Sequence, residues 1–195
     1  MPLPAEARFW VSRALGLWRR GWASLRTRGL SASWARLLQQ FRRSAVLTQA
    51  LYAPASIPFA PFAMPTSTVP RASIVIPVFG AFAHTLACLR AIAAHPPLAA
   101  FEIIVVDDAS PDDSLVKLRA IDGLHVHARA ANGGFIAACN DGASLALGEV
   151  LVFLNNDTVP QPGWLDALID TFDTHPDAGL VGAKLLYPDG RLQEA

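Results

Sequence analysis

Polar side chains follow two apolar runs of this sequence, at the point where each run ends. Asp107 and Asp108 come directly after the run 101–106, and the Asn-Asn-Asp segment 155–157 comes after the run 150–154. Carboxylate and amide oxygens can hold a hard divalent cation, or accept hydrogen bonds from a ribose and a base. A nucleotide diphosphate needs such a cation to offset its charge before it can leave. These residues therefore favour a nucleotide site with a divalent cation.

A purely structural role competes with this interpretation, because Asp and Ser also cap helices. Asp112 and Asp113 stand just before an expected helix and fit the capping role well. Asp107 and Asp157 stand at the ends of expected strands and fit it less well. The second pair therefore carries more of the chemical interpretation than the first.

A glycine pair opens a further expected helix in the sequence Ala131-Asn132-Gly133-Gly134. Two glycines there would let a ligand approach backbone N–H groups at the positive end of the helix, which suggests a phosphate or ribose contact. An Asn-Gly turn also connects elements that bind nothing. The pair supports a ligand site only together with the acidic segments.

Short apolar runs alternate with helical stretches from Ala72 onward, which is typical of a parallel α/β sheet. Ligands of such sheets lie beyond the carboxyl ends of the strands. A turn at 188–190 would open a hairpin whose returning strand is cut off. The expected strands are 73–77, 101–106, 124–128, 150–154 and 179–187, and the expected helices are 84–95, 112–121, 134–147 and 162–175.

Charge divides the 195 residues into two parts. Residues 1–47 hold nine Arg and the single acidic residue Glu6, whereas residues 48–195 hold seven basic and fifteen acidic residues. An acidic body gathers divalent cations more readily than it binds a nucleic-acid backbone, so no nucleic-acid partner is expected. Hydrophobic residues make up 52% of the chain, which excludes a disordered class. The two separated cysteines, Cys88 and Cys139, indicate core thiols in a reducing compartment.

The region 1–47 is expected to form basic amphipathic helices. Its first apolar stripe follows helical spacing, with Arg on the flanks, and consists of Val11, Leu15, Trp18, Trp22 and Leu25. Trp and Leu beside Arg suit an anionic membrane surface, which would place a cytoplasmic protein peripherally on the inner face of the cell membrane. Packing of these helices on each other or on the rest of the protein is an equally weighted alternative.

An uncharged, Pro-rich linker is expected at 48–71, before the domain 72–195. Residues 44–70 carry no charge and are interrupted by five prolines. Repeated proline removes backbone donors and would leave carbonyls unpaired in lipid. The composition therefore favours an extended linker over a membrane span.

From about Ala72 to Ala195 the residues resemble the family 2 glycosyltransferases. The motifs occur in the order SIVIPVF, EIIVVDDASPDDS, NGGFIAACNDG, GEVLVFLNNDTVPQPGWLDAL and GLVGAKLLYPDGRLQEA. They look most like the bacterial branch that builds surface polysaccharides, with rhamnosyltransferase-like members. The resemblance implies an α/β fold with the GT-A (Rossmann-like) nucleotide-sugar-binding sheet, incomplete at the C-terminus. It also implies inverting transfer of a hexosyl or rhamnosyl group from a nucleotide-diphosphate donor to a glycan or lipid-linked acceptor.

The same resemblance assigns the donor site residue by residue. The end of the first strand and Asp107 would line the base and ribose pocket, and Asp108 would support it. The segment 155–157 would stand where the family's Asp-x-Asp motif holds diphosphate and Mg²⁺ or Mn²⁺. The predicted donor-binding residues are Pro77, Phe79, Asp107, Asp108, Gly133, Gly134, Asn155 and Asn156, and the predicted metal ligand is Asp157.

Two positions depart from the family pattern. Gly80 stands where Asn is frequent, and Asn155 replaces the first Asp of the metal motif, which leaves Asp157 as its one strong ligand. In the family, the acceptor site and the general base come later than Ala195. The chain is therefore expected to be an N-terminal piece that holds most of the donor site and lacks the catalytic base. A non-catalytic nucleotide-sugar-binding fragment is the alternative.

Proteins of other classes share parts of this pattern. A phosphorelay receiver domain has an acidic pair, a later Asp and a Lys, which Asp107, Asp108, Asp157 and Lys184 imitate. The acidic pair here follows the second strand, and Lys184 precedes Leu and not Pro, so this alternative is remote. A dinucleotide-dependent oxidoreductase would need Gly-x-Gly-x-x-Gly after the first strand, where only Gly80 is present.

Overall fold

The computed structural model describes residue 54 and residues 58–194 of the chain. By its internal contacts the chain divides into a unit at Met1–Leu51 and a unit at Tyr52–Ala195. The predicted basic helices at 1–47 lie outside the described residues. The fold below concerns the second unit alone.

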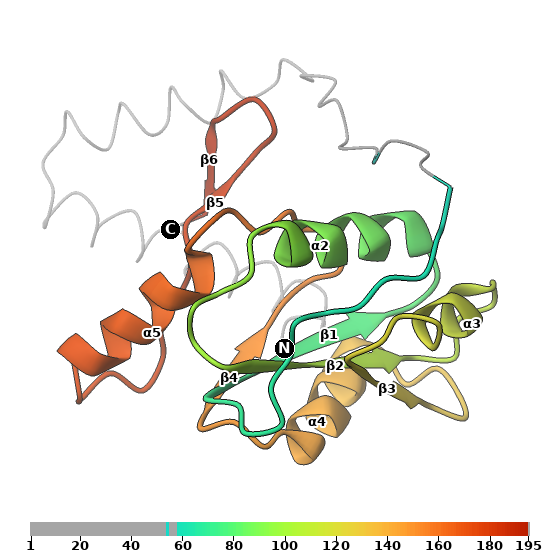
Figure 1. Ribbon diagram of the computed structural model, residues 1–195, viewed down its shortest axis with the longest axis horizontal. Coiled ribbons are helices and arrows are strands. Elements are labelled where there is room, and N and C mark those ends of the chain that lie inside the picture. Colours follow the sequence, from blue (N-terminus) through green and yellow to red (C-terminus); the bar gives the residue numbers. More distant parts are fainter. Residues whose placement is uncertain (1–53, 55–57, 195) are drawn as a thin grey trace, which may run out of the picture. The chain divides into compact units, whose positions relative to one another are not determined.

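A parallel sheet of four strands, in the order β3-β2-β1-β4, forms the centre of this unit (Figure 1). The strands are β1 (Ala72–Val78), β2 (Phe101–Asp107), β3 (Leu124–Ala128) and β4 (Val150–Phe153). β1 pairs with β2 from Ala72 opposite Phe101 to Val78 opposite Asp107, and with β4 from Ala72 opposite Val150. The chain thus builds outward to β3 and then returns to the other side of β1, so strand order reverses between β1 and β4.

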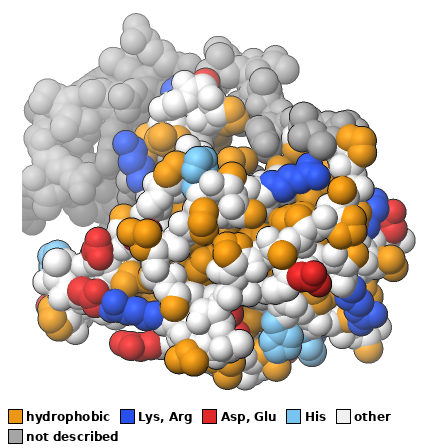
Figure 2. Space-filling model, viewed as in Figure 1, with side chains coloured by type: hydrophobic (Ala, Val, Ile, Leu, Met, Phe, Trp, Pro, Cys, Tyr) orange, Lys and Arg blue, Asp and Glu red, His pale blue; other side chains and the backbone are white. Residues whose placement is uncertain are grey.

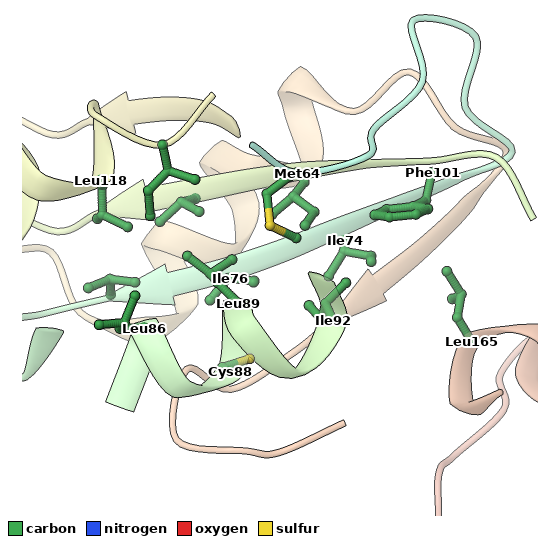
Figure 3. Packing of buried hydrophobic residues seen from close by; sticks show 14 of the residues in the cluster. Met64, Ile74, Ile76, Leu86, Cys88, Leu89, Ile92, Phe101, Leu118 and Leu165 are labelled. Atoms are coloured by element: carbon green, nitrogen blue, oxygen red, sulfur yellow. The ribbon is translucent and has the colours of Figure 1, made fainter. Parts of the chain in front are cut away.

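The two central strands are buried along their whole length, which explains their nearly continuous apolar sequences. Helix α2 (Phe82–Ala94) covers one face, where Leu86, Leu89 and Ile92 meet Ile74 and Ile76 (Figure 3). The other face packs against α4 (Phe135–Leu145).

Close approach of α4 to the sheet depends on Gly142. A Cβ at this position would collide with the Val75 side chain and lie 3.0 Å from Cγ2 of Val106. The helix can therefore lie directly on β1 and β2 only because residue 142 has no side chain.

The remaining helices are α3 (Ser114–Leu118) and α5 (Trp164–Thr174). All four helices predicted within 72–195 are present. α2 begins two residues earlier and ends one residue earlier than predicted, and the other three are shorter than predicted. The antiparallel pair β5 (Leu185–Leu186) and β6 (Leu192–Glu194) forms the predicted hairpin, with the Tyr187 N–H donating to the Arg191 carbonyl at 2.8 Å.

The last predicted strand, 179–187, is wrong in extent. Only Leu185 and Leu186 have strand structure, and residues 179–184 are irregular. Glycine at 179 and 182 weakens strand formation, and no strand in the described part of the chain pairs with this stretch.

Residues 58–67 of the predicted linker are irregular chain that packs against the core through Phe59, Phe62 and Met64. Met64 is buried, its N–H donates to the Asp122 carbonyl at 2.9 Å, and the Ser67 N–H donates to the Phe101 carbonyl at 2.8 Å. Phe59 lies edge-on to Phe82 with ring centroids 5.2 Å apart. This segment therefore helps to hold the domain together.

The visible surface of the unit carries basic and acidic side chains interspersed with apolar ones (Figure 2). Among the described residues, no helix is both long and apolar enough to cross a membrane.

Because Met64 is 5% exposed within the core, we expect Met64→Ala to lower the free energy of unfolding by about 2–5 kcal/mol. The matched control is Val69→Ala in the same segment, since Val69 is 82% exposed and its truncation should change stability by about 0.5 kcal/mol or less. Urea unfolding followed by circular dichroism measures both. Equal midpoints for the two variants would show that this segment is not part of the folded core.

Candidate functional site

Backbone hydrogen bonds join the strand ends at the carboxyl edge of the sheet. The Asp108 N–H donates to the Val78 carbonyl at 2.8 Å, and the Arg129 N–H donates to the Asp107 carbonyl at 2.9 Å. The ends of β1, β2 and β3 are therefore fixed side by side. The sequence-predicted groups lie together at this edge: Pro77 and Phe79 at the end of β1, and the acidic pair at the end of β2.

Asp107 is the most enclosed acidic residue of the edge, with 1% of its surface exposed. Its Oδ2 accepts a hydrogen bond from the Ser110 N–H at 3.2 Å. Its Oδ1 is buried and has no hydrogen-bond partner among the described residues. Leaving a buried carboxylate oxygen without a donor is costly, so this atom needs an explanation.

The loops after β1 and β2 are joined to each other next to Asp107. The Gly80 N–H donates to Oγ of Ser110 at 2.7 Å, which ties the first loop to the second. Gly80 has φ +66°, and Ala81 and Ala109 have φ 53° and 59° without being glycine. For the two alanines such conformations cost about 1–3 kcal/mol each, and strained residues of this kind concentrate at ligand sites. Glycine at position 80, where the family often has Asn, suits its own backbone conformation.

Of the two acidic residues expected to cap α3, Asp112 does so and Asp113 does not. Oδ1 of Asp112 accepts from the Ser114 N–H at 3.0 Å, next to the helix start. Asp113 makes no capping hydrogen bond and pairs instead with Lys117, one turn on, at 2.8 Å. Both residues have structural partners, which leaves Asp107 and Asp108 as the chemically distinctive pair.

Asp108 is also buried, 4% exposed, but both of its carboxylate oxygens accept hydrogen bonds. Its carboxylate accepts from the N–H groups of Gly133, at 2.9 Å, and Gly134, at 2.8 Å, and from Nη1 of Arg129. Burial raises the pKa of Asp108, but the hydrogen bonds from Gly133, Arg129 and Gly134 together hold it below its ordinary value.

The two glycine N–H groups are therefore engaged within the protein. These N–H groups could donate to a ligand phosphate only if their hydrogen bonds to Asp108 broke. The geometry therefore does not support the phosphate contact that was expected at the glycine pair. What the glycine pair does here is bind the carboxylate at the end of the neighbouring strand.

Arg129 was not among the residues predicted from the sequence. Besides Asp108, it binds Oδ2 of Asp141 on α4 through Nε at 2.6 Å. Arg129 is the first residue after β3, and parallel pairing with β2 brings that position beside the acidic pair. The parallel pairing of β2 with β3 could have indicated Arg129 as a site residue, whereas no sequence motif does.

The segment after β4 is more open. Asn155 and Asp157 are exposed, and Asn156 is half-buried with its Nδ2 donating to Oγ1 of Thr85 at 3.0 Å. Among the described residues, no three His, Cys, Asp or Glu side chains gather as a metal-binding group. Asp157 is therefore an exposed single carboxylate, able to contribute one ligand to a cation that has other ligands.

Both cysteines are buried, as predicted. Burial raises the pKa of Cys88 to about 12. Its Sγ lies 3.9 Å from Oγ1 of Thr158, close to the end of β4. A thiol in this state remains protonated and does not act as a nucleophile.

The fold and the edge site define an α/β protein whose ligand-binding position is the carboxyl edge of a parallel sheet. Residues 73–194 match the family model described as glycosyl transferase family 2. The chain belongs to this family, and its α/β sheet has the GT-A fold.

Two individual proteins are similar to parts of the chain. The chain is 32% identical over 132 residues to glycosyltransferase AglE of Haloferax volcanii, covering 64% of this chain and 43% of that protein. It is 49% identical over 57 residues to the O-antigen biosynthesis protein RfbC of Myxococcus xanthus, covering 29% and 4%. The chain thus spans less than half the length of each.

A solved structure shares the fold. The mannosyltransferase PcManGT from Pyrobaculum calidifontis, determined in complex with GDP-Man and Mn²⁺, superimposes with a TM-score of 0.52 at 21% identity. The match covers 69% of this chain and 40% of that one. At this identity the likeness concerns the fold alone.

The lowered pKa of Asp108 predicts an acid-sensitive fold. Its ionised form stabilises the protein above the ordinary aspartate pKa of about 3.9, and this contribution is lost as the pH falls through the lower folded-state pKa. We expect Asp108→Asn to be less stable near neutral pH and to lose less further stability between about pH 5 and about pH 2 than the parent.

Urea unfolding at a series of pH values measures this difference, with Asp177→Asn as the control because Asp177 is exposed. An acid dependence in Asp108→Asn as steep as the parent's would contradict the assigned partners of Asp108.

Proposed function

We propose that the protein containing this chain transfers a hexosyl or rhamnosyl group, with inversion, from a nucleotide-diphosphate donor to a glycan or lipid-linked acceptor in cell-surface polysaccharide synthesis. Membership of glycosyl transferase family 2 supports the transfer. The name of RfbC, an O-antigen biosynthesis protein, supports the polysaccharide setting. In this proposal the described residues supply the donor site.

One observation carries the proposal: the buried Oδ1 of Asp107 with no hydrogen-bond partner among the described residues. A base N–H or a ribose hydroxyl is the kind of donor this oxygen requires. Because the oxygen is enclosed, a nucleoside reaches it only when the loops joined by Gly80 and Ser110 part. The positive φ angles of Ala81 and Ala109 favour such a rearrangement, since leaving them relieves strain.

The neighbouring groups fit the same ligand. Phe79 follows β1 and is 55% exposed, so its ring is available for a base to stack on. Pro77, two residues earlier, is buried within β1. Asp108 accepts from Gly133 and Gly134 and so holds the loop after β3 next to the end of β2.

The segment Asn155–Asp157 is proposed to face the diphosphate. A cation such as Mg²⁺ is usually held by one or two carboxylates, the substrate's phosphates and water, so a single exposed carboxylate at Asp157 fits one that arrives with the donor. When bound, Mg²⁺ or Mn²⁺ offsets the charge of the leaving nucleotide diphosphate. Asn155 and Asn156 offer amide groups beside it. We assign no described residue to the general base that an acceptor hydroxyl requires.

Titration with UDP and GDP, each with and without Mn²⁺, tests this site. Asp107→Ala should weaken binding with and without the metal, because it removes the acceptor for the nucleoside; one hydrogen bond to a charged group is worth about 10-fold or more in affinity. Asp157→Ala should abolish only the increment that Mn²⁺ adds. Asp177→Ala is the exposed control. If both site variants bind like the parent, the site is placed wrongly.

For the predicted basic helices at 1–47 we propose an anionic membrane surface as partner, which would bring the donor site to lipid-linked acceptors. Each Arg near such a surface contributes about 1 kcal/mol, so even half of the nine Arg would hold the protein there. The whole chain should co-sediment with phosphatidylglycerol vesicles at low salt and be released at high salt.

The matched control for this experiment is the chain shortened to begin at Tyr52, which keeps the packed segment 58–67 and should not co-sediment. Equal sedimentation of both chains would assign vesicle binding to residues 52–195, and no sedimentation of the longer chain would favour packing of the helices within the protein; either result contradicts the proposal.

A further inference from the structure

We infer that Arg129 is a positioning residue of the donor site, which holds Asp108 and the loop 129–134 in place beside Asp107 without touching the donor itself. The inference rests on the proposed function, because it assumes that a nucleotide binds at Asp107. It adds a residue that no sequence motif indicated.

The contacts of Arg129 reach three parts of the site at once. Its backbone N–H donates to the Asp107 carbonyl at 2.9 Å, its Nη1 binds the Asp108 carboxylate, and its Nε binds Asp141 of α4 at 2.6 Å. The side chain is 19% exposed. A mostly buried guanidinium that donates along fixed directions to two carboxylates is more rigid than an exposed ion pair.

Gly133 lies against this guanidinium. A Cβ on residue 133 would collide with Nη1 of Arg129 and lie 2.7 Å from Nη2 and 2.9 Å from Cζ. A side chain at residue 133 would therefore displace the guanidinium from its present position beside Asp108, whose carboxylate also accepts from the Gly133 N–H at 2.9 Å. The absence of a side chain at Gly133 thus leaves the space that the Arg129 guanidinium occupies.

Charge gives the second reason for the arrangement. Asp107 and Asp108 are consecutive and both buried, so two negative charges stand where an anionic nucleotide would have to approach. Among the described residues, Arg129 is the one cation in ion-pair contact with either carboxylate. Without it, Asp108 would be a buried charge held by two amides alone, which is costly and repels the ligand.

A double-mutant cycle on the whole chain tests whether Arg129 acts through Asp108, with the Kd for UDP and for GDP in the presence of Mn²⁺ as the readout. Arg129→Met should raise the Kd by about 10- to 100-fold. Combining Arg129→Met with Asp108→Asn should give the Kd of Asp108→Asn alone within about twofold, because the guanidinium then has no carboxylate to position. Arg119→Met, on an exposed arginine, is the control and should bind like the parent.

Two further variants keep the test independent of folding. Arg129→Lys keeps the positive charge but lacks the planar set of guanidinium N–H donors. It should bind the nucleotide more tightly than Arg129→Met and less tightly than the parent. Gly133→Ala leaves every charge in place but displaces the guanidinium, and should weaken binding as Arg129→Met does. Melting temperatures above the assay temperature establish that each variant is folded.

Two results would overturn the inference: parent-like affinity of both Arg129→Met and Gly133→Ala, or effects of Arg129→Met and Asp108→Asn that multiply in the double variant, as independent contacts would. A parent chain that binds neither UDP nor GDP would overturn the proposed function itself, and the inference with it. Binding by the parent with unchanged Arg129 variants would overturn the inference alone.

Discussion

Two consecutive buried carboxylates at the end of β2 are the constraint on which this site depends. Burial of an ionised group must be offset by hydrogen bonds or an opposite charge. Asp108 has both, from two amides and Arg129, whereas Asp107 has one amide and an unpartnered Oδ1 among the described residues. Glu102, near the other end of β2, is a buried carboxylate with internal partners: its Oε1 accepts from Oγ of Ser73 and from the Leu147 N–H. This contrast is the reason why we propose Asp107 as the residue that contacts a ligand.

The pairing of the strands places the other predicted site residues around Asp107 and Asp108. Parallel pairing aligns the end of β1 with Asp107 and the first residue after β3 with the same strand end. Return of the chain to β4 on the other side of β1 sets Asn155–Asp157 at the far side of the switch in strand order. Burial of α2 and α4 against opposite faces keeps these ends in register (Figure 1).

Much of the fold could be predicted because the sheet is buried. The runs that became β1 and β2 are nearly continuously apolar and buried along their whole length, so pattern and burial agree there. The bounds of β3 were also predicted exactly, although this strand is only partly buried. The strand expected over 179–187 was too long because its apolar residues are exposed and have no described strand to pair with. Arg129 and the use of the Gly133 and Gly134 amides depend on contacts between distant segments, which no spacing reveals. The roles of the predicted site residues toward a donor remain predictions.

The central claim is that Asp107 receives a nucleoside at the carboxyl edge of the sheet. A crystal structure of the chain with UDP or GDP and Mg²⁺ tests it most directly. The account predicts a nitrogen or hydroxyl of the nucleoside about 2.7–3.2 Å from Oδ1 of Asp107, with the Gly80 and Ser110 loops moved apart and the Arg129–Asp108 pair intact. A nucleotide bound elsewhere, or bound at this edge with Asp107 still enclosed and out of contact, would contradict it.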